Sequence, residues 1–398
     1  MTDPSFEPYT GPPPTRSPGP GWYAAPPPPA GGWYPQPPGW YPPPPPMYPP
    51  PTALRWAPPP GTPPFDVPRP FLLAMRSRDW GWWRPLLGLL LIGVVYLAVN
   101  VGVALLGLLT ELVAGGSLAA LPDMATLDLT DPWILLLINL SLIVVIPCIW
   151  LAWGAAHGMK IGWSSSVLGR LRWRLFGPYA LRAFATLGAA VLLTVLLAFA
   201  LGEEAATGPV RSLGWLVVVV LLTTPLQAAA EEYFFRGYLS QAIAGWVRGP
   251  RAGAVVAALI TAALFSWAHG PTDLSTFLDR FAVGLAASAV VWLTGGLEAA
   301  IALHAVNNLV VFLVAGILGD GSAAEDSPDG VPALVLLLTV AALAGYVVLV
   351  ARSRTRLHPE LGTPSLDLRA GRVSSSSAPE GATPGGWGNW QPDSFWFR

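Results

Sequence analysis

Eight long apolar runs constrain the fold of this chain more than any other feature. Each is close to the roughly 20 residues that an α-helix needs to cross a bilayer. The chain is 53% hydrophobic and only 11% charged, and its mean hydropathy of +0.50 is outside the range of ordinary soluble domains. We therefore expect an all-α, polytopic membrane helix bundle of about eight transmembrane helices. The runs cover approximately residues 86–110, 133–155, 179–201, 213–245, 252–272, 276–294, 297–318 and 331–351.

The charges between these runs alternate in sign. Basic residues precede the first run and follow the second, fourth and eighth, namely Arg76, Arg78, Arg84, Lys160, Arg170, Arg172, Arg174, Arg182, Arg248, Arg251, Arg352, Arg354 and Arg356. The other connections are acidic and hold Asp123, Asp128, Asp131, Glu203, Glu204, Asp273, Asp279, Asp320, Glu325, Asp326 and Asp329. Since positively charged loops stay in the cytoplasm, the pattern predicts a multi-pass protein of the cell membrane with both termini cytoplasmic.

Two polar tails flank the predicted membrane domain of residues 71–356. Residues 1–70 are dominated by proline, and residues 357–398 are rich in Ser, Pro and Gly, so both are predicted to be disordered. Gly-Trp-Tyr recurs three times in the first tail, where it could recruit a cytoplasmic partner or be sticky low-complexity sequence. The net charge of −1 says nothing about nucleic acid, but the chain has no basic patch, so no nucleic-acid partner is expected.

The segment Ala228–Leu239, AAAEEYFFRGYL, places two carboxylates and an arginine at the end of an apolar run. Ionisable groups in a membrane helix are costly and are usually functional or paired. Glu232 and Arg236 are four residues apart, so they can pair along one helix face. Glu231 lies about 100° around the helix and is left for other work. The alternative is a cluster that only fixes the depth of the helix.

Further polar residues follow on later runs. His269 comes one turn after Phe265, and His304 shares a helix face with Asn308, with Asn307 beside them and Glu298 near the start of the same run. Glu231 and His269 both lie about 27–30 Å along a helix from the Gly249-Pro250 turn. His304 is only about 10 Å from the turn at Gly295-Gly296. The groups can therefore meet only if the hairpin at Gly249-Pro250 projects past that turn.

Three motifs in order, Glu-Glu-x-x-x-Arg at Glu231, Phe-x-x-x-His at Phe265 and His-x-x-x-Asn at His304, resemble those of the CPBP intramembrane proteases. This superfamily includes the type II CAAX prenyl protease and bacteriocin-processing or immunity proteins. The resemblance covers a protease core of about residues 213–318. It implies an endopeptidase acting on a membrane-embedded protein or peptide, which could be prenylated. It also implies that Glu231 activates a water beside His269, while His304 and Asn308 support the oxyanion.

Other chemistries remain open. The chain has no His-Glu-x-x-His zinc motif, but Glu231, His269 and His304 could in principle bind zinc. Cys148 is the single cysteine and provides no metal framework. The same Glu and His residues could serve as the proton relay of a transporter. A third possibility is a non-catalytic membrane scaffold that displays its proline-rich tail.

Overall fold

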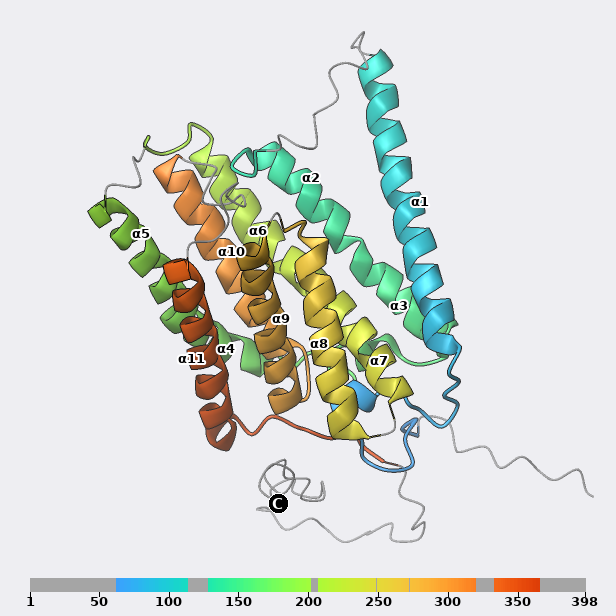
Figure 1. The fold of residues 1–398 in the computed structure, drawn as a ribbon. Coiled ribbons are helices and arrows are strands. Elements are labelled where there is room, and N and C mark those ends of the chain that lie inside the picture. Colours follow the sequence, from blue (N-terminus) through green and yellow to red (C-terminus); the bar gives the residue numbers. More distant parts are fainter. Residues whose placement is uncertain are drawn as a thin grey trace, which may run out of the picture. The chain divides into compact units, whose positions relative to one another are not determined.

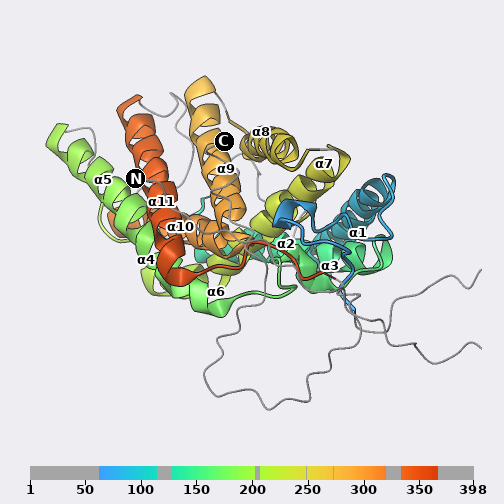
Figure 2. The same cartoon turned by 90° about the horizontal axis from the view of Figure 1, so that it is seen from below.

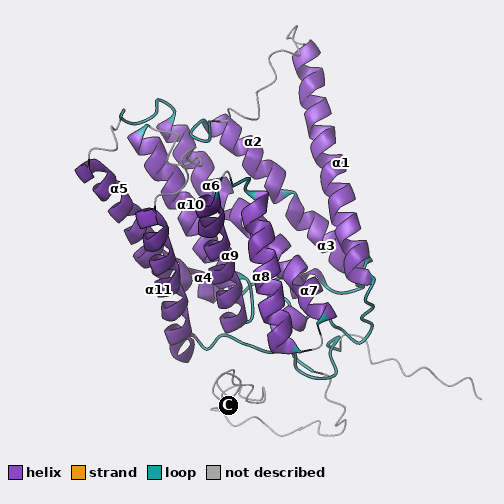
Figure 3. Cartoon of the chain, in the orientation of Figure 1, coloured by secondary structure: helices purple, strands orange, loops and turns teal. Residues whose placement is uncertain are grey.

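The computed structural model describes residues 62–113, 128–201, 207–247, 249–271, 273–319 and 333–365, and in these ranges the chain forms helices without strands (Figures 1 and 3). In chain order the elements are the 3₁₀ helix η1 (Phe71–Leu73), α1 (Arg84–Val113), α2 (Pro132–Ile143), α3 (Val145–Ala155), the 3₁₀ helices η4 (Ile161–Ser164) and η5 (Trp173–Leu175), α4 (Phe176–Ala183), the π-helix η6 (Phe184–Gly188), α5 (Ala189–Leu201), α6 (Leu213–Glu232), the π-helix η7 (Tyr233–Leu239), α7 (Ser240–Trp246), α8 (Pro250–Ala268), α9 (Leu274–Thr294), α10 (Glu298–Leu318) and α11 (Ala333–Leu357).

Eight stretches within these ranges are long and apolar enough to cross a membrane, which confirms the predicted all-α bundle of a multi-pass membrane protein. Several elements join into one stretch, because α2 continues into α3, α4 into α5, and α6 through η7 into α7. The stretches are Arg84–Leu105, Pro132–Ala155, Trp173–Ala200, Leu213–Trp246, Pro250–Ala268, Leu274–Thr294, Glu298–Leu318 and Ala333–Leu357.

The helix ends follow local sequence signals. Asp131 caps α2 by accepting from the backbone N–H groups of Trp133 and Ile134, and a proline occupies the first turn. Asp273 caps α9 in the same way. Gly295 ends α9 in the left-handed conformation, with φ of 70°, which glycine adopts without the strain of a Cβ atom. The turn to α10 can therefore be short.

Helices α6, α8, α9 and α10 form the centre of the bundle. α6 packs on α10 and α2, α8 packs on α9, and α9 also packs on α10 and α11. About half of the α9 stretch is buried, whereas 11% of the α1 stretch is. Figures 1 and 2 show α1 and α5 at opposite edges. The exposed leucines and valines of α1 are therefore suited to contact lipid.

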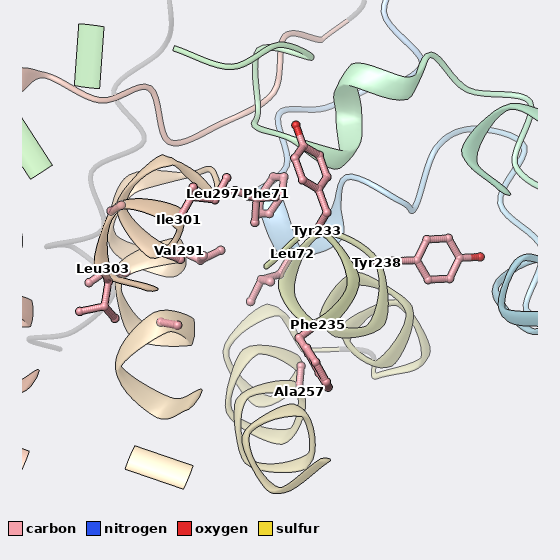
Figure 4. Packing of buried hydrophobic residues seen from close by; sticks show 14 of the residues in the cluster. Phe71, Leu72, Tyr233, Phe235, Tyr238, Ala257, Val291, Leu297, Ile301 and Leu303 are labelled. Atoms are coloured by element: carbon pink, nitrogen blue, oxygen red, sulfur yellow. The ribbon is translucent and has the colours of Figure 1, made fainter. Parts of the chain in front are cut away.

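The π-helix η7 contributes three aromatic side chains to the hydrophobic core. Figure 4 shows Tyr233, Phe235 and Tyr238 pointing to different sides of it. The hydroxyl of Tyr233 hydrogen-bonds Ser165 at 2.6 Å, and the Phe235 ring packs edge-on against Phe265 of α8. The hydroxyl of Tyr238 lies 3.0 Å from Nε2 of His157, whose pKa is lowered to about 4 by burial and by nearby Arg84. These contacts hold η7 against α8 and the segment after α3.

A buried ion pair joins the segment after α3 to the start of α10. Arg172 and Glu298 make two side-chain hydrogen bonds of 2.9 and 2.6 Å, and their side chains are 3% and 0% exposed. Glu360, which follows α11, also pairs with Arg172 at 3.3 Å. Glu298 therefore has a structural role, which is to pair with Arg172 at the start of α10.

The folded part extends further into both tails than the sequence predicted. Residues 62–70 and 357–365, which fall within the predicted tails of residues 1–70 and 357–398, are described and make packing contacts. Phe65 is 1% exposed and packs edge-on against Trp163. The backbone N–H of Thr363 donates to the carbonyl of Arg69, and the N–H of Arg69 donates to the Thr363 hydroxyl. These contacts offset the conformational entropy that the two segments lose when they become ordered.

Other sequence predictions lie outside the described residues. These are the Gly-Trp-Tyr triplets, the remainder of both tails, and Asp123, Glu203, Glu204, Arg248, Asp320, Glu325, Asp326 and Asp329.

Replacing Arg172 with Met should destabilise the protein by about 3–5 kcal/mol, because Glu298 is then left buried without its cation. Unfolding in mixed micelles, followed by circular dichroism, measures the change. The matched control is Arg78→Met, since Arg78 pairs with Asp66, whose side chain is 64% exposed. Such exposed pairs contribute about 0–1 kcal/mol. Equal losses in the two variants would contradict the structural role of the buried pair.

Candidate functional site

Three neighbouring helical stretches bring the six predicted site residues together. Glu231 and Glu232 end α6, Arg236 lies in η7, His269 is the C-cap residue of α8, and His304 and Asn308 lie on α10. Glu231, His269 and His304 lie at the same height along their helices, since atoms of both histidines lie within 4 Å of Glu231.

The innermost part is an ion pair with no exposed surface. Arg236 donates to Glu232 at 2.9 Å, and both side chains are 0% exposed, which confirms the predicted pairing. Nδ1 of His304 lies 3.0 Å from the same Glu232 oxygen. Arg236 also donates to the carbonyl of Gly284 on α9 at 3.0 Å. A buried charge needs such partners, and here they tie α6, η7, α9 and α10 to one another.

At Gly284, α9 lies in close contact with α8. A Cβ atom there would lie 2.7 Å from Cα of Ala262 and 3.3 Å from the guanidinium of Arg236. Only glycine leaves room for the helix contact and for the arginine beneath it.

Glu231 faces the two histidines, away from Arg236. Its Oε2 atom lies 3.7 Å from Nε2 of His269 and 3.8 Å from Nε2 of His304. This oxygen is buried and makes no hydrogen bond to the described residues. The separations exceed a direct hydrogen bond and suit a bridging water. The prediction that Glu231 is not matched by Arg236 therefore agrees with the geometry.

The histidine tautomers follow from the partners of their Nδ1 atoms. Nδ1 of His269 lies 2.7 Å from the carbonyl of Phe265, which can only accept, so this nitrogen carries the proton. Nδ1 of His304 likewise faces a carboxylate. In the neutral rings both Nε2 atoms are then acceptors. Three acceptors thus converge: Oε2 of Glu231 and the Nε2 atoms of both histidines.

The site runs from a buried interior to an exposed edge. Glu232 and Arg236 are fully buried, Glu231 is 12% exposed and the His269 side chain is 31% exposed. His269 is followed by the short connection from α8 to α9. His269 is thus the most exposed of these four residues.

Gln227 belongs to this site, and the sequence analysis missed it. Its side chain is buried, donates to Oε1 of Glu231, and accepts from Asn308 at 3.2 Å. Asn307 in turn donates to Asn308 at 3.3 Å. The available signal was a polar residue one helical turn before Glu231 in an otherwise apolar run.

The structure gives no support for a zinc site. Among the described residues, no group of three or more His, Cys, Asp and Glu side chains could hold a metal. The predicted zinc set of Glu231, His269 and His304 therefore gains no support.

Comparison with protein families gives one match. Residues 213–310 fit the family described as type II CAAX prenyl endopeptidase Rce1-like. This range holds α6 to α9, part of α10, and all six predicted site residues. The resemblance based on the three motifs is thus confirmed. Curated proteins and solved structures gave no match.

The two adjacent glutamates should differ sharply in their effect on stability. Glu232→Gln leaves Arg236 buried with no full counter-charge and should cost about 3–5 kcal/mol of unfolding free energy. Glu231→Gln should cost much less, because Glu231 has no arginine partner and can keep its contact with Gln227. Thermal unfolding of both purified variants in one detergent measures this difference. Equal stabilities would contradict the division of roles between the two carboxylates.

Proposed function

We propose that this chain, a member of the CPBP intramembrane proteases through its residues 213–310, hydrolyses peptide bonds with a water activated by Glu231. The match supports a CAAX-type endopeptidase in general. The observation that carries the proposal further is the convergence of Oε2 of Glu231 with Nε2 of His269 and of His304. Three acceptors around one point attract the protons of a water and raise the nucleophilicity of its oxygen.

In the proposed reaction, Glu231 is the general base and His269 holds the water beside it. Oε2 of Glu231 takes a proton from the water, and the water oxygen forms a bond to the scissile carbonyl carbon. The carbon–nitrogen bond then breaks as the protonated carboxyl of Glu231 gives this proton to the leaving nitrogen. Water is consumed, and the products are a new carboxylate and a new amine.

Asn308 and His304 supply the stabilisation of the tetrahedral oxyanion. One N–H of the Asn308 amide is used by Gln227, and the second can donate to the oxyanion. Glu232 holds the His304 ring in place through Nδ1. Nε2 is an acceptor in the neutral ring, so His304 donates to the oxyanion after it has taken up a proton from solvent. Because these donors sit on packed helices, they need little reorganisation as charge develops.

The substrate we propose is a membrane-associated protein or peptide, which could be prenylated or CAAX-like. The site lies within apolar helices, so a substrate held at the bilayer reaches it without leaving the membrane. Polar cavities between helices can hold the water that lipid would exclude.

Glu231→Gln should reduce peptide hydrolysis to background, because the amide keeps the shape of the side chain and cannot take a proton. Purified protein in detergent with a fluorogenic prenyl-peptide measures turnover, and Glu360→Gln, outside the site, is the control. Comparison of membrane-protein termini in cells with and without the variant identifies substrates. A chelator should leave activity unchanged, since the proposed mechanism uses no metal.

Two outcomes would redirect this proposal. Wild-type turnover in Glu231→Gln excludes Glu231 as the general base. Loss with a chelator and recovery with zinc would make Glu231, His269 and His304 metal ligands.

We further propose that both termini lie in the cytoplasm and that the protein resides in the cell membrane. The helix ends that carry most of the basic residues gather at the lower end of Figure 1, where α1 begins, α7 meets α8 and α11 ends. Reporter fusions at Ser165 and Arg356 should therefore be cytoplasmic, and a fusion at Gly208 should be external. An external reporter at Ser165 would overturn this orientation.

A further inference from the structure

We infer that Gln227 is a positioning residue that fixes the proposed base and the proposed oxyanion donor in one arrangement. The inference rests on the proposed function and deepens it. Gln227 lies on α6, is 6% exposed, and contacts Glu231 on its own helix and Asn308 on α10. The uncharged amide group of Gln227 therefore links Glu231, the proposed base, to Asn308, the proposed oxyanion donor.

The orientation of this amide follows from Glu231. An ionised carboxylate can only accept hydrogen bonds, so the nitrogen of Gln227 must face Oε1 of Glu231. The oxygen of Gln227 then faces Asn308. Because that oxygen can also only accept, Asn308 must turn its nitrogen toward Gln227. The carboxylate thus determines the orientation of both amides.

This orientation decides what Asn308 presents to a substrate. Its oxygen accepts from Asn307, and one of its two N–H groups donates to Gln227. The second N–H is left to donate to an oxyanion. In the opposite orientation Asn308 would present its oxygen, which repels an oxyanion. Gln227 therefore ensures that a donor faces the reacting carbonyl.

Gln227 also leaves Glu231 able to act as a base. It holds Oε1 through a neutral donor, so Oε2 remains directed at the two Nε2 atoms. Glu232 shows the contrast, since its partner is the positive charge of Arg236. A neutral partner orients a carboxylate without supplying the counter-charge that would weaken its basicity.

Gln227→Met tests the inference, since methionine fills a similar volume and makes neither hydrogen bond. We expect kcat to fall by about 10²-fold with KM nearly unchanged, because base and donor lose their geometry but substrate contacts persist. The matched control is Gln241→Met in α7. Gln241 is also buried, and its amide donates to the carbonyl of Trp163, outside the site. The turnover of Gln241→Met per folded molecule should match that of the wild-type protein.

Gln227→Glu gives a readout that a packing role would not produce. A protonated glutamate has one O–H donor and one carbonyl acceptor, which reproduces the pattern of glutamine. An ionised one cannot donate and repels Glu231. The ratio of variant to wild-type kcat should therefore be higher at about pH 5.5 than at about pH 8. A ratio that is flat across this range would overturn the inference.

A double variant separates action through Asn308 from an independent effect. If Gln227 acts by orienting Asn308, adding Gln227→Met to Asn308→Ala should lower kcat by less than Gln227→Met does alone. Fully additive losses would contradict the inference.

The failure of this inference is distinguishable from failure of the proposed function. Wild-type kcat in Gln227→Met, with Glu231→Gln inactive, would refute the role of Gln227 alone. Wild-type kcat in both would refute the glutamate mechanism itself, and the role of Gln227 with it.

Discussion

Glu232 and Arg236 form a charge pair inside a bundle whose surroundings are mostly apolar, and neither side chain has exposed surface. An unpaired charge at this depth would be costly, so every partner of the pair is constrained in position. Those partners are His304 on α10, the carbonyl of Gly284 on α9, and the Phe265 ring of α8, which lies 4.8 Å from the guanidinium. The relative placement of four helices therefore depends on one ion pair. The neighbouring Glu231 lies in this rigid frame but does not form the ion pair with Arg236.

The π-helix η7 shows how the chain makes room for this pair. A π-helix widens the backbone spiral, and such segments are frequent at functional sites. Ser240 donates to the carbonyl of Phe235 five residues earlier and contacts Thr261 of α8 at 3.2 Å. The wider turn is thus held open by hydroxyl groups and by the aromatic side chains around it. Its shape is supported from several sides, as a precisely placed arginine requires.

The sequence was informative where the relevant physics is local. The spans followed from apolar length, and the Glu232–Arg236 pair followed from a spacing of four on one helix. Contacts between helices were harder to predict. The hydrogen bond between His304 and Glu232, for example, depends on the relative depth of two helices in the membrane. The widened turn of η7 has no evident local signal. Gln227 was within reach, because it lies one turn before Glu231. The burial of Phe65 was not predicted, because the disorder of residues 1–70 was inferred from the proline content of the whole segment and a single buried side chain hardly changes that content.

The two hydrogen bonds between Arg69 and Thr363 join segments separated by almost the whole folded part of the chain. They place the entry and the exit of this domain next to each other, so the connectivity approximates a closed ring. When the two ends of a domain lie close together, the position of the chain termini has little effect on the packing of its helices. A circular permutant, with residue 365 linked to residue 62 and new ends between α5 and α6, would leave Glu231 and Glu232 on an uninterrupted stretch from α6 to α11. The order in which the helices are synthesised is then separable from the arrangement in which they function.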